Sequence, residues 1–259
     1  MNILLLLFLS ILPIYLIGLY FYKKDTIKEP KKLLKKLFIS GILAGIIVII
    51  LSFSVFIFFP KFINTENLNN IELLIYCFVF IAFIEEITKW FMIYNISYNQ
   101  KDFDQYYDII LYSVFVGLGF ACFENVIYVL DSNQAFQIAI LRSLTAIPGH
   151  ACFQTMMGYF LSNCKFKLHG SFNKNIILSI IIPTILHGIY DYLLLSNNLS
   201  FVIIYLFFII GMFIITVVKI KQSVKYDKKR INSNICPNCN SYIEFNYCSN
   251  CGYKKTNRE

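Results

Sequence analysis

The sequence predicts an all-α polytopic membrane protein with about seven transmembrane helices and a small polar tail. Hydrophobic residues make up 58% of the 259 residues and charged residues only 15%, whereas an ordinary soluble domain is about 25% charged. Seven apolar runs are long enough to cross a bilayer core of about 30 Å, since a helix rises about 1.5 Å per residue. Charged residues gather between these runs and after the last one.

The predicted helices follow the apolar runs in order. These runs lie at approximately 2–22, 37–59, 71–94, 107–130, 136–162, 175–195 and 200–219. The first run has no basic residue ahead of it and no small-residue cleavage site before Lys23, so we expect a retained helix and not a secretory signal. In the fifth run, Pro148 is expected to kink the helix and free a backbone carbonyl just before His150.

The basic residues of the short loops predict the orientation in the membrane. Loops 23–36, 95–106 and 163–174 contain eleven Lys, whereas the alternate loops contain only Lys61. Because basic loops stay in the cytoplasm, we expect a multi-pass protein of the bacterial cell membrane, with its N-terminus outside and its tail inside. The same distribution explains the formal charge of +8, so nucleic acid is not expected as a partner.

The chain is expected to divide into three parts: a membrane domain over 1–219, a basic linker over 220–235 and a metal-binding tail over 236–253. The tail contains two C-x-x-C pairs, formed by Cys236, Cys239, Cys248 and Cys251. Four thiolates complete the tetrahedral shell of a structural Zn²⁺, and so short a segment needs such a cross-link to fold. A zinc ribbon is therefore predicted, with a redox pair or rubredoxin-like iron as alternatives. We expect it to dock a cytosolic partner.

Glu85 and Glu86 form the first polar element inside the membrane. An ionised carboxylate in hydrocarbon costs at least about 2.5–3.5 kcal/mol, so such a pair indicates a functional site. Lys89 follows at helical spacing and lies on the same face. An ion pair that only bridges helices would account for Lys89 and one Glu, but it would leave the second Glu unexplained.

A second polar element follows two glycines in the fourth run. Gly117 and Gly119 allow another helix to approach closely, a pattern that alone indicates packing. Glu124 and Asn125 come next, and both must then face the interior of the bundle. An intramembrane Glu shifts the interpretation toward function.

The fifth and sixth runs contribute the remaining polar residues. Arg142 is expected near the outer membrane interface, where its side chain would snorkel toward water. His150 is as readily a hydrogen-bonded core residue as a catalytic one. His187 and Asp191 are four residues apart on one helix face, so Asp191 can orient the imidazole.

These acids and histidines form one candidate catalytic set on four helices: Glu85, Glu86, Glu124, His150, His187 and Asp191. Paired Glu with His fits a membrane peptidase that activates water, and a His/Glu metal site is a variant of it. The sequence contains no H-E-x-x-H zinc motif, and Phe120 stands where a membrane aspartyl protease needs Asp. The alternative from another class is a non-enzymatic membrane sensor, or a transporter of protons or metal ions.

The motifs in combination resemble a known family. They are Glu-Glu-x-x-Lys at 85–89, Gly-x-Gly-Phe-Ala-x-x-Glu-Asn-x-x-Tyr at 117–128, the segment from His150 through Tyr159, and His-Gly-x-Tyr-Asp at 187–191. This set is similar to the PrsW family of glutamate-type intramembrane proteases, distant relatives of the CAAX prenyl proteases. The likeness covers roughly residues 35 to 195.

The resemblance implies a protease that makes the first cut in a single-pass membrane substrate such as an anti-sigma factor, as part of regulated proteolysis in a stress response. By position, Glu85 and Glu86 would be the catalytic carboxylates, supported by Glu124, His187 and Asp191. No cofactor is expected to be required at the active site. The sequence departs from the family pattern in two ways: Ile84 stands where a third Glu would precede the pair, and a Cys-rich tail is appended.

Overall fold

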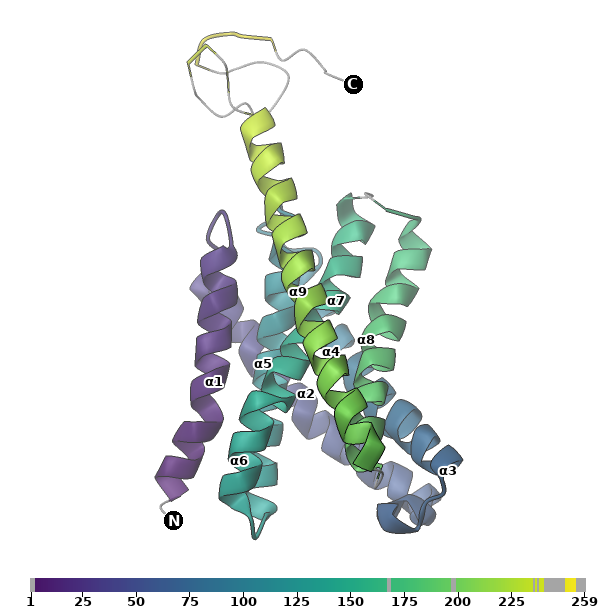
Figure 1. Ribbon diagram of the computed structural model, residues 1–259. Coiled ribbons are helices and arrows are strands. Elements are labelled where there is room, and N and C mark those ends of the chain that lie inside the picture. Colours follow the sequence, from purple (N-terminus) through teal and green to yellow (C-terminus); the bar gives the residue numbers. More distant parts are fainter. Residues whose placement is uncertain are drawn as a thin grey trace.

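The computed structural model describes residues 3–166, 169–196, 199–234, 236, 238–239 and 250–254. These residues form a helical bundle whose helices run mostly side by side, with the start of α1 at one end and the last turns of α9 projecting beyond the other (Figure 1). The helices are α1 (Ile3–Lys24), α2 (Lys31–Phe58), α3 (Asn70–Ile75), η3 (Tyr76–Phe83), α4 (Ile84–Ser97), α5 (Asp108–Asp131), α6 (Ala135–Leu144), α7 (Ala146–Phe166), α8 (Phe172–Leu195) and α9 (Leu199–Ser233). Two 3₁₀ turns, η1 (Pro60–Ile63) and η2 (Thr65–Asn67), connect α2 to α3.

The predicted all-helical architecture is confirmed, because each apolar run is almost entirely helical in the described part of the chain. Among the described residues, the helices that are long and apolar enough to cross a membrane are four, α2, α5, α8 and α9, so the predicted number of seven transmembrane helices is not confirmed. The third run is built from α3, η3 and α4, which follow one another without an intervening loop. Its middle part, η3, is π-helical.

Two boundaries differ from the prediction. The fifth run is not one kinked helix, since α6 ends at Leu144 and α7 begins at Ala146. Thr145 between them has φ −123° and ψ −60°, so Pro148 falls in the first turn of α7, where its missing N–H costs no hydrogen bond. The last helix does not end at 219 but continues to Ser233, so most of the expected linker is helical.

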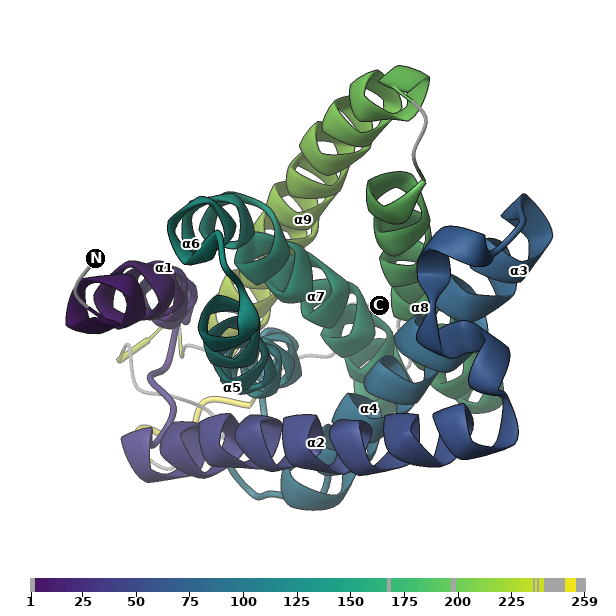
Figure 2. The ribbon, with the colours of Figure 1, turned by 90° about the horizontal axis from the view of Figure 1, so that it is seen from below.

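The helix α5 is the centre of the bundle and packs against α1, α2, α4, α6 and α7 (Figure 2). Its closest approach is to α2, where a Cβ built on Gly119 would overlap the backbone carbonyl of Phe38. Gly41 faces the backbone of Val116 in the same way. The close helix approach predicted from the glycines is therefore confirmed. It holds α5, the helix that contains Glu124, against α2.

Replacing Gly119 by Ala is expected to destabilise the protein by about 1–3 kcal/mol, because the added methyl group meets backbone that cannot move aside. Gly211 in α9 provides a matched control, since a Cβ there meets nothing within 4 Å. Thermal unfolding of the purified variants in detergent measures the difference. Equal melting temperatures for G119A and G211A would contradict the close α2–α5 contact.

The extended part of α9 is fixed to the bundle. The carboxylate of Asp227 accepts hydrogen bonds from the backbone N–H groups of Tyr106 and Tyr107, both at 2.8 Å. In the neighbouring loop before α2, Glu29 accepts a hydrogen bond from Tyr112, and burial raises the pKa of Glu29 to about 7. The end of the bundle from which α9 projects is thus held by buried carboxylates and not by free linkers.

Candidate active site

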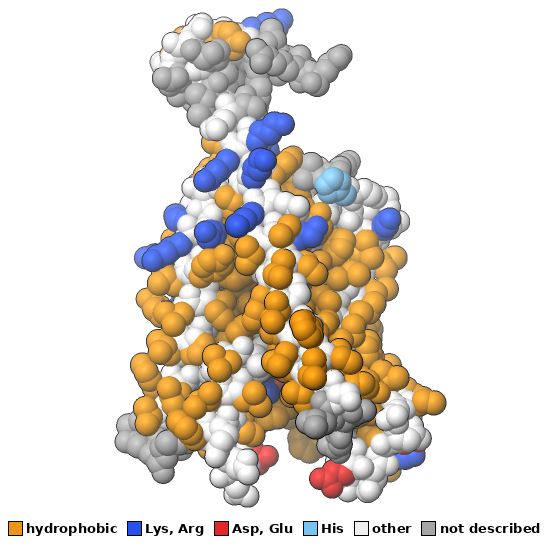
Figure 3. All heavy atoms as spheres, in the orientation of Figure 1, with side chains coloured by type: hydrophobic (Ala, Val, Ile, Leu, Met, Phe, Trp, Pro, Cys, Tyr) orange, Lys and Arg blue, Asp and Glu red, His pale blue; other side chains and the backbone are white. Residues whose placement is uncertain are grey.

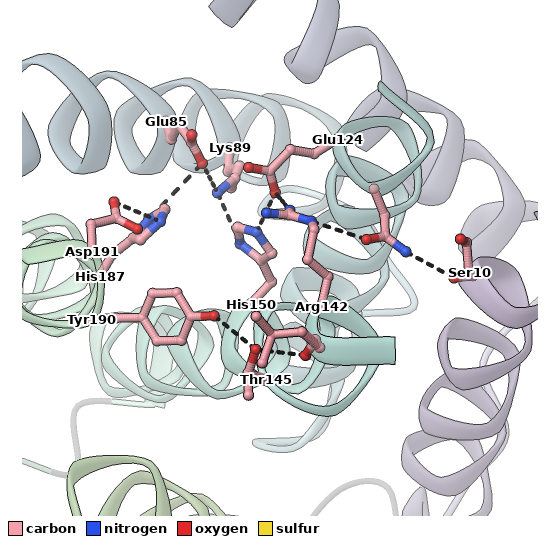
Figure 4. A network of polar contacts seen from close by, with 12 residues as sticks. Ser10, Glu85, Lys89, Glu124, Arg142, Thr145, His150, His187, Tyr190 and Asp191 are labelled. Carbon is pink, nitrogen blue, oxygen red and sulfur yellow. Dashed lines mark hydrogen bonds and ion pairs between the residues drawn. The ribbon is translucent and has the colours of Figure 1, made fainter. Parts of the chain in front are cut away.

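All six residues of the predicted catalytic set converge in the interior of the bundle. Figure 4 labels each of them except Glu86. They come from α4, α5, α7 and α8, and five of them are connected through the side chain of Lys89 or the ring of His187. Glu124 joins the group through His150. The sequence placed these residues on four helices, and the packing brings those helices together.

The local fold explains how α4 presents its carboxylates. The π-helical segment η3 ends at Phe83, and only Ile84 separates it from Glu85 and Glu86. Such segments shift the register of a helix face and are frequent at functional sites. On the facing helix α8, Gly188 lies so close to the ring of Phe78 in η3 that no larger residue would fit without a shift. This contact places the neighbouring His187 against the carboxylates.

Lys89 is the central cation of the site. Its ammonium donates to Glu85 Oε2 at 3.0 Å and to Glu86 Oε1 at 2.9 Å. Lys89 and Glu86 are both 0% exposed, so neither charge reaches solvent. The ammonium also lies 3.8 Å from the centre of the Phe120 ring, which adds a cation–π contact. One buried cation therefore serves both carboxylates.

His150 bridges Lys89 and Glu124. Its Nδ1 lies 3.4 Å from the Lys89 ammonium and its Nε2 lies 2.9 Å from Glu124 Oε2. Because an ammonium can only donate, Nδ1 is the acceptor, and the proton on Nε2 is donated to Glu124. His150 is therefore a buried histidine whose orientation is fixed from both sides, and its catalytic role stays a prediction.

Arg142 does not snorkel to the interface as expected. Its guanidinium turns inward, where Nη2 lies 2.7 Å from Glu124 Oε2 and Nε donates to Asn125 Oδ1 at 3.0 Å. The ring of Tyr128 packs beneath it, 3.9 Å from the guanidinium carbon. A buried carboxylate without a charge partner is costlier than a buried ion pair, so Glu124 holds Arg142 inside.

His187 lies between two carboxylates. Its Nδ1 is 3.0 Å from Glu86 Oε1, and its Nε2 is 3.4 Å from Asp191 Oδ2. The ring of Phe153 stacks on the imidazole at 4.7 Å between centroids. The predicted contact between His187 and Asp191 is confirmed, and His187 can hold or pass a proton at either nitrogen.

Sequence reasoning missed Gln154. Its amide donates to Glu86 Oε2 at 2.7 Å, while its buried Oε1 has no hydrogen-bond partner among the described residues. Gln154 stands four residues after His150 on the same face of α7, which is the spacing that pointed to His187 and Asp191. A polar residue within an apolar run, one turn from a candidate histidine, was the available signal.

The site also contains a set of possible metal ligands. One donor atom from each of Glu85, Glu86, His150 and His187 lies within 4.8 Å of the others. Two imidazoles and two carboxylates suit Zn²⁺ by donor type, and a metal held there would polarise a carbonyl or a bound water. The Lys89 ammonium already lies among three of these donors at 2.9–3.4 Å, so a metal would have to displace it or share the donors with it.

The tail brings together three of the four predicted cysteine ligands, Cys236, Cys239 and Cys251. Cys248 lies outside the described residues. The sulfur atoms of Cys236 and Cys251 are 3.4 Å apart. A disulfide would require about 2.05 Å, whereas two thiolates on one tetrahedral ion with bonds of about 2.3 Å are about 3.8 Å apart. The three sulfur atoms lie within 4.8 Å of one another, which is close enough for them to share a metal ion.

Fold and site together define a class: a multi-pass helical membrane protein with a buried centre of carboxylates and imidazoles. Residues 29–218 match the PrsW family of intramembrane metalloproteases. The chain belongs to this family of membrane proteases, as the motifs predicted.

Several relatives support this assignment. The chain is 32% identical to Protease PrsW of Oceanobacillus iheyensis, over 79% of this chain and 89% of the relative. It is 32% identical to Protease PrsW of Clostridioides difficile over 88% and 94% of the two chains, and 31% identical to that of Bacillus subtilis over 73% and 84%. No solved structure matches the chain. The relatives favour a peptidase over the sensor or transporter alternative.

Proposed function

We propose that this protein is an intramembrane endopeptidase that cuts a single-pass membrane protein with water activated by a glutamate. The observation that carries the proposal is the pair of carboxylates at Glu85 and Glu86, which share the Lys89 ammonium and lie against His187. The group lies in the middle of the continuous helix from α3 to α4, a position suited to peptide bonds within the membrane. No cofactor is required at the active site in this scheme.

Glu85 is the better placed general base. Both oxygens of Glu86 are engaged, one by Lys89 and His187 and the other by Gln154, and Glu86 is fully buried. Glu85 is 6% exposed and contacts Lys89 through Oε2. We therefore assign Glu85 as the general base, and we assign Glu86 the role of holding Lys89 and His187 in place.

In the reaction, Glu85 takes a proton from water while the water oxygen bonds to the carbonyl carbon of the substrate. The carbon–nitrogen bond then breaks as His187 donates a proton to the leaving nitrogen. The proton on Glu85 restores His187, whose Nδ1 lies 4.0 Å from Glu85 Oε2. Asp191 orients His187. Glu124 with Arg142 orients His150, whose Nδ1 lies beside the Lys89 ammonium, and this ammonium offsets the developing negative charge.

The orientation of the chain in the membrane belongs to the same proposal. On the face seen in Figure 3, Lys and Arg side chains gather at the end of the bundle from which α9 projects, and Asp and Glu are seen at the opposite end. Basic segments stay in the cytoplasm, so this end is inside and the N-terminus is outside. The resemblance supports an anti-sigma factor as substrate, cut in response to stress at the cell envelope.

We further propose that the cysteine tail is a zinc ribbon that binds a cytosolic partner and takes no part in catalysis. The spacing of Cys236, Cys239 and Cys251 supports the metal, and Cys248 supplies the fourth thiolate. A four-thiolate site has no open position for substrate, so its metal is structural.

A truncation separates the metal of the tail from the catalytic site. The chain ended after Ser233 keeps Asp227 in place, so we expect it to cut a single-pass substrate in liposomes at near the full rate, also in the presence of a chelator. The chain ended after Tyr226 loses both hydrogen bonds of Asp227 and should be less stable. If a chelator abolishes the activity of the chain that ends after Ser233 and Zn²⁺ restores it, a metal activates the water.

A further inference from the structure

A groove of about 430 Å³ lies between α1, α2 and α5, and its lining includes none of the candidate active-site residues. Among the described residues, α1 packs against α5, α6 and α7 but not closely against α2. The groove therefore runs between α1 and α2, which lie apart (Figure 2). Its floor is formed by Phe115 and Leu118 of α5. The groove opens to the surroundings of the bundle, where the bilayer lies.

The lining of the groove changes along its length. Aliphatic and aromatic side chains line most of it, including Ile11 and Ile14 of α1 and Phe38 of α2. The exceptions are Lys31 and Lys35, which stand at the first turns of α2, beside Tyr22 at the end of α1. Both Lys residues are exposed, so their charges are available at one end of an apolar channel.

The length of the groove identifies the kind of occupant. From Ile11 to Tyr22 the helix α1 rises about 16 Å, at about 1.5 Å per residue. This length matches the hydrocarbon of one leaflet, about half of a core of about 30 Å. A transmembrane substrate helix needs the full thickness, about twice the length available. An acyl chain of one leaflet fits, and its headgroup would then lie at Lys31 and Lys35.

We infer that the α1–α2 groove is a binding site for an anionic phospholipid, with an acyl chain along Phe115 and Leu118 and the phosphate headgroup held by Lys31 and Lys35. The two ammonium groups select a negative headgroup, because a basic side chain near the membrane surface attracts anionic lipid. The site lies on the far side of α5 from the carboxylates that bind Lys89, so it is independent of the proposed catalysis.

Quenching by brominated lipid tests this site. The chain has one tryptophan, so W90F combined with F115W places the only indole on the floor of the groove. Full-length protein is reconstituted in phosphatidylcholine vesicles that contain dibrominated phosphatidylglycerol or dibrominated phosphatidylcholine. We expect half-maximal quenching at a mole fraction of phosphatidylglycerol roughly tenfold lower than for phosphatidylcholine.

Lys32 and Lys36 provide the matched control, since each follows a groove lysine by one residue on α2 and neither lines the groove. The K31Q/K35Q variant should lose the preference for phosphatidylglycerol, and K32Q/K36Q should keep it. Native mass spectrometry of the protein with its natural tryptophan should show retained phosphatidylglycerol that only K31Q/K35Q loses. Equal effects of the two variants, or equal quenching by both lipids, would overturn the site and leave only general attraction to the membrane surface.

Discussion

Replacing Glu85 by Gln is expected to lower the rate of substrate cleavage by about 10²–10⁴-fold while the protein keeps its fold. Gln preserves the volume of the side chain and can still accept a hydrogen bond from Lys89, but it cannot take a proton from water. Glu85 contacts the ammonium through one oxygen and is slightly exposed, so the amide disturbs little of the buried network. Initial rates on a single-pass substrate in liposomes, together with thermal unfolding, measure both effects.

The same substitution at two other positions shows whether the effect is specific. E86Q should also lose activity, but it should melt earlier, because Glu86 holds Lys89, His187 and Gln154 at once. E66Q changes an exposed Glu in η2 and should leave rate and stability unchanged. If E85Q still cuts at the normal rate, Glu85 is not the general base and the assignment within the pair is wrong.

The fold was predictable from the sequence as far as hydrophobicity alone decides it. The apolar runs predicted where the helices lie along the chain. Gly117 and Gly119 predicted a close contact with another helix, and Gly119 makes this contact with α2. The break at Thr145 and the π-helical segment before Glu85 were not predicted. Both depend on how neighbouring helices pack, and no local residue pattern in the two runs specifies them.

The candidate site was predictable within each helix and not between helices. The spacing of Glu85 with Lys89 and of His187 with Asp191 fixes their contacts, because residues four apart share a helix face. The inward turn of Arg142 depends instead on Glu124 of another helix. The contact of Gln154 with Glu86 depends in the same way on how α4 and α7 are both packed against α5 and α8.

Replacing Lys89 by Met is expected to lower the free energy of unfolding by about 3–5 kcal/mol, the cost of leaving a buried charge without its partner. Met has a similar length but no charge. In the described part of the site, the Lys89 ammonium is the only charged group within 3.0 Å of both Glu85 and Glu86, and this substitution removes it. K61M is the matched control, because Lys61 pairs with Glu72 and its side chain is 60% exposed. That exposed pair should contribute less than about 1 kcal/mol.

A double variant separates lost charge balance from lost packing. If Lys89 acts by compensating the carboxylates, E86Q in the K89M background should restore stability, with a coupling energy of about 1–3 kcal/mol. Cleavage should stay absent in K89M/E86Q, since the groups proposed to hold His187 in place remain altered. Chemical denaturation in detergent gives the free energies of unfolding of the original protein, K89M, E86Q and K89M/E86Q, from which the coupling energy is calculated. A K89M protein as stable as K61M, or a double variant less stable than the sum of the single changes, would show that the Lys89 ammonium does not hold the site together.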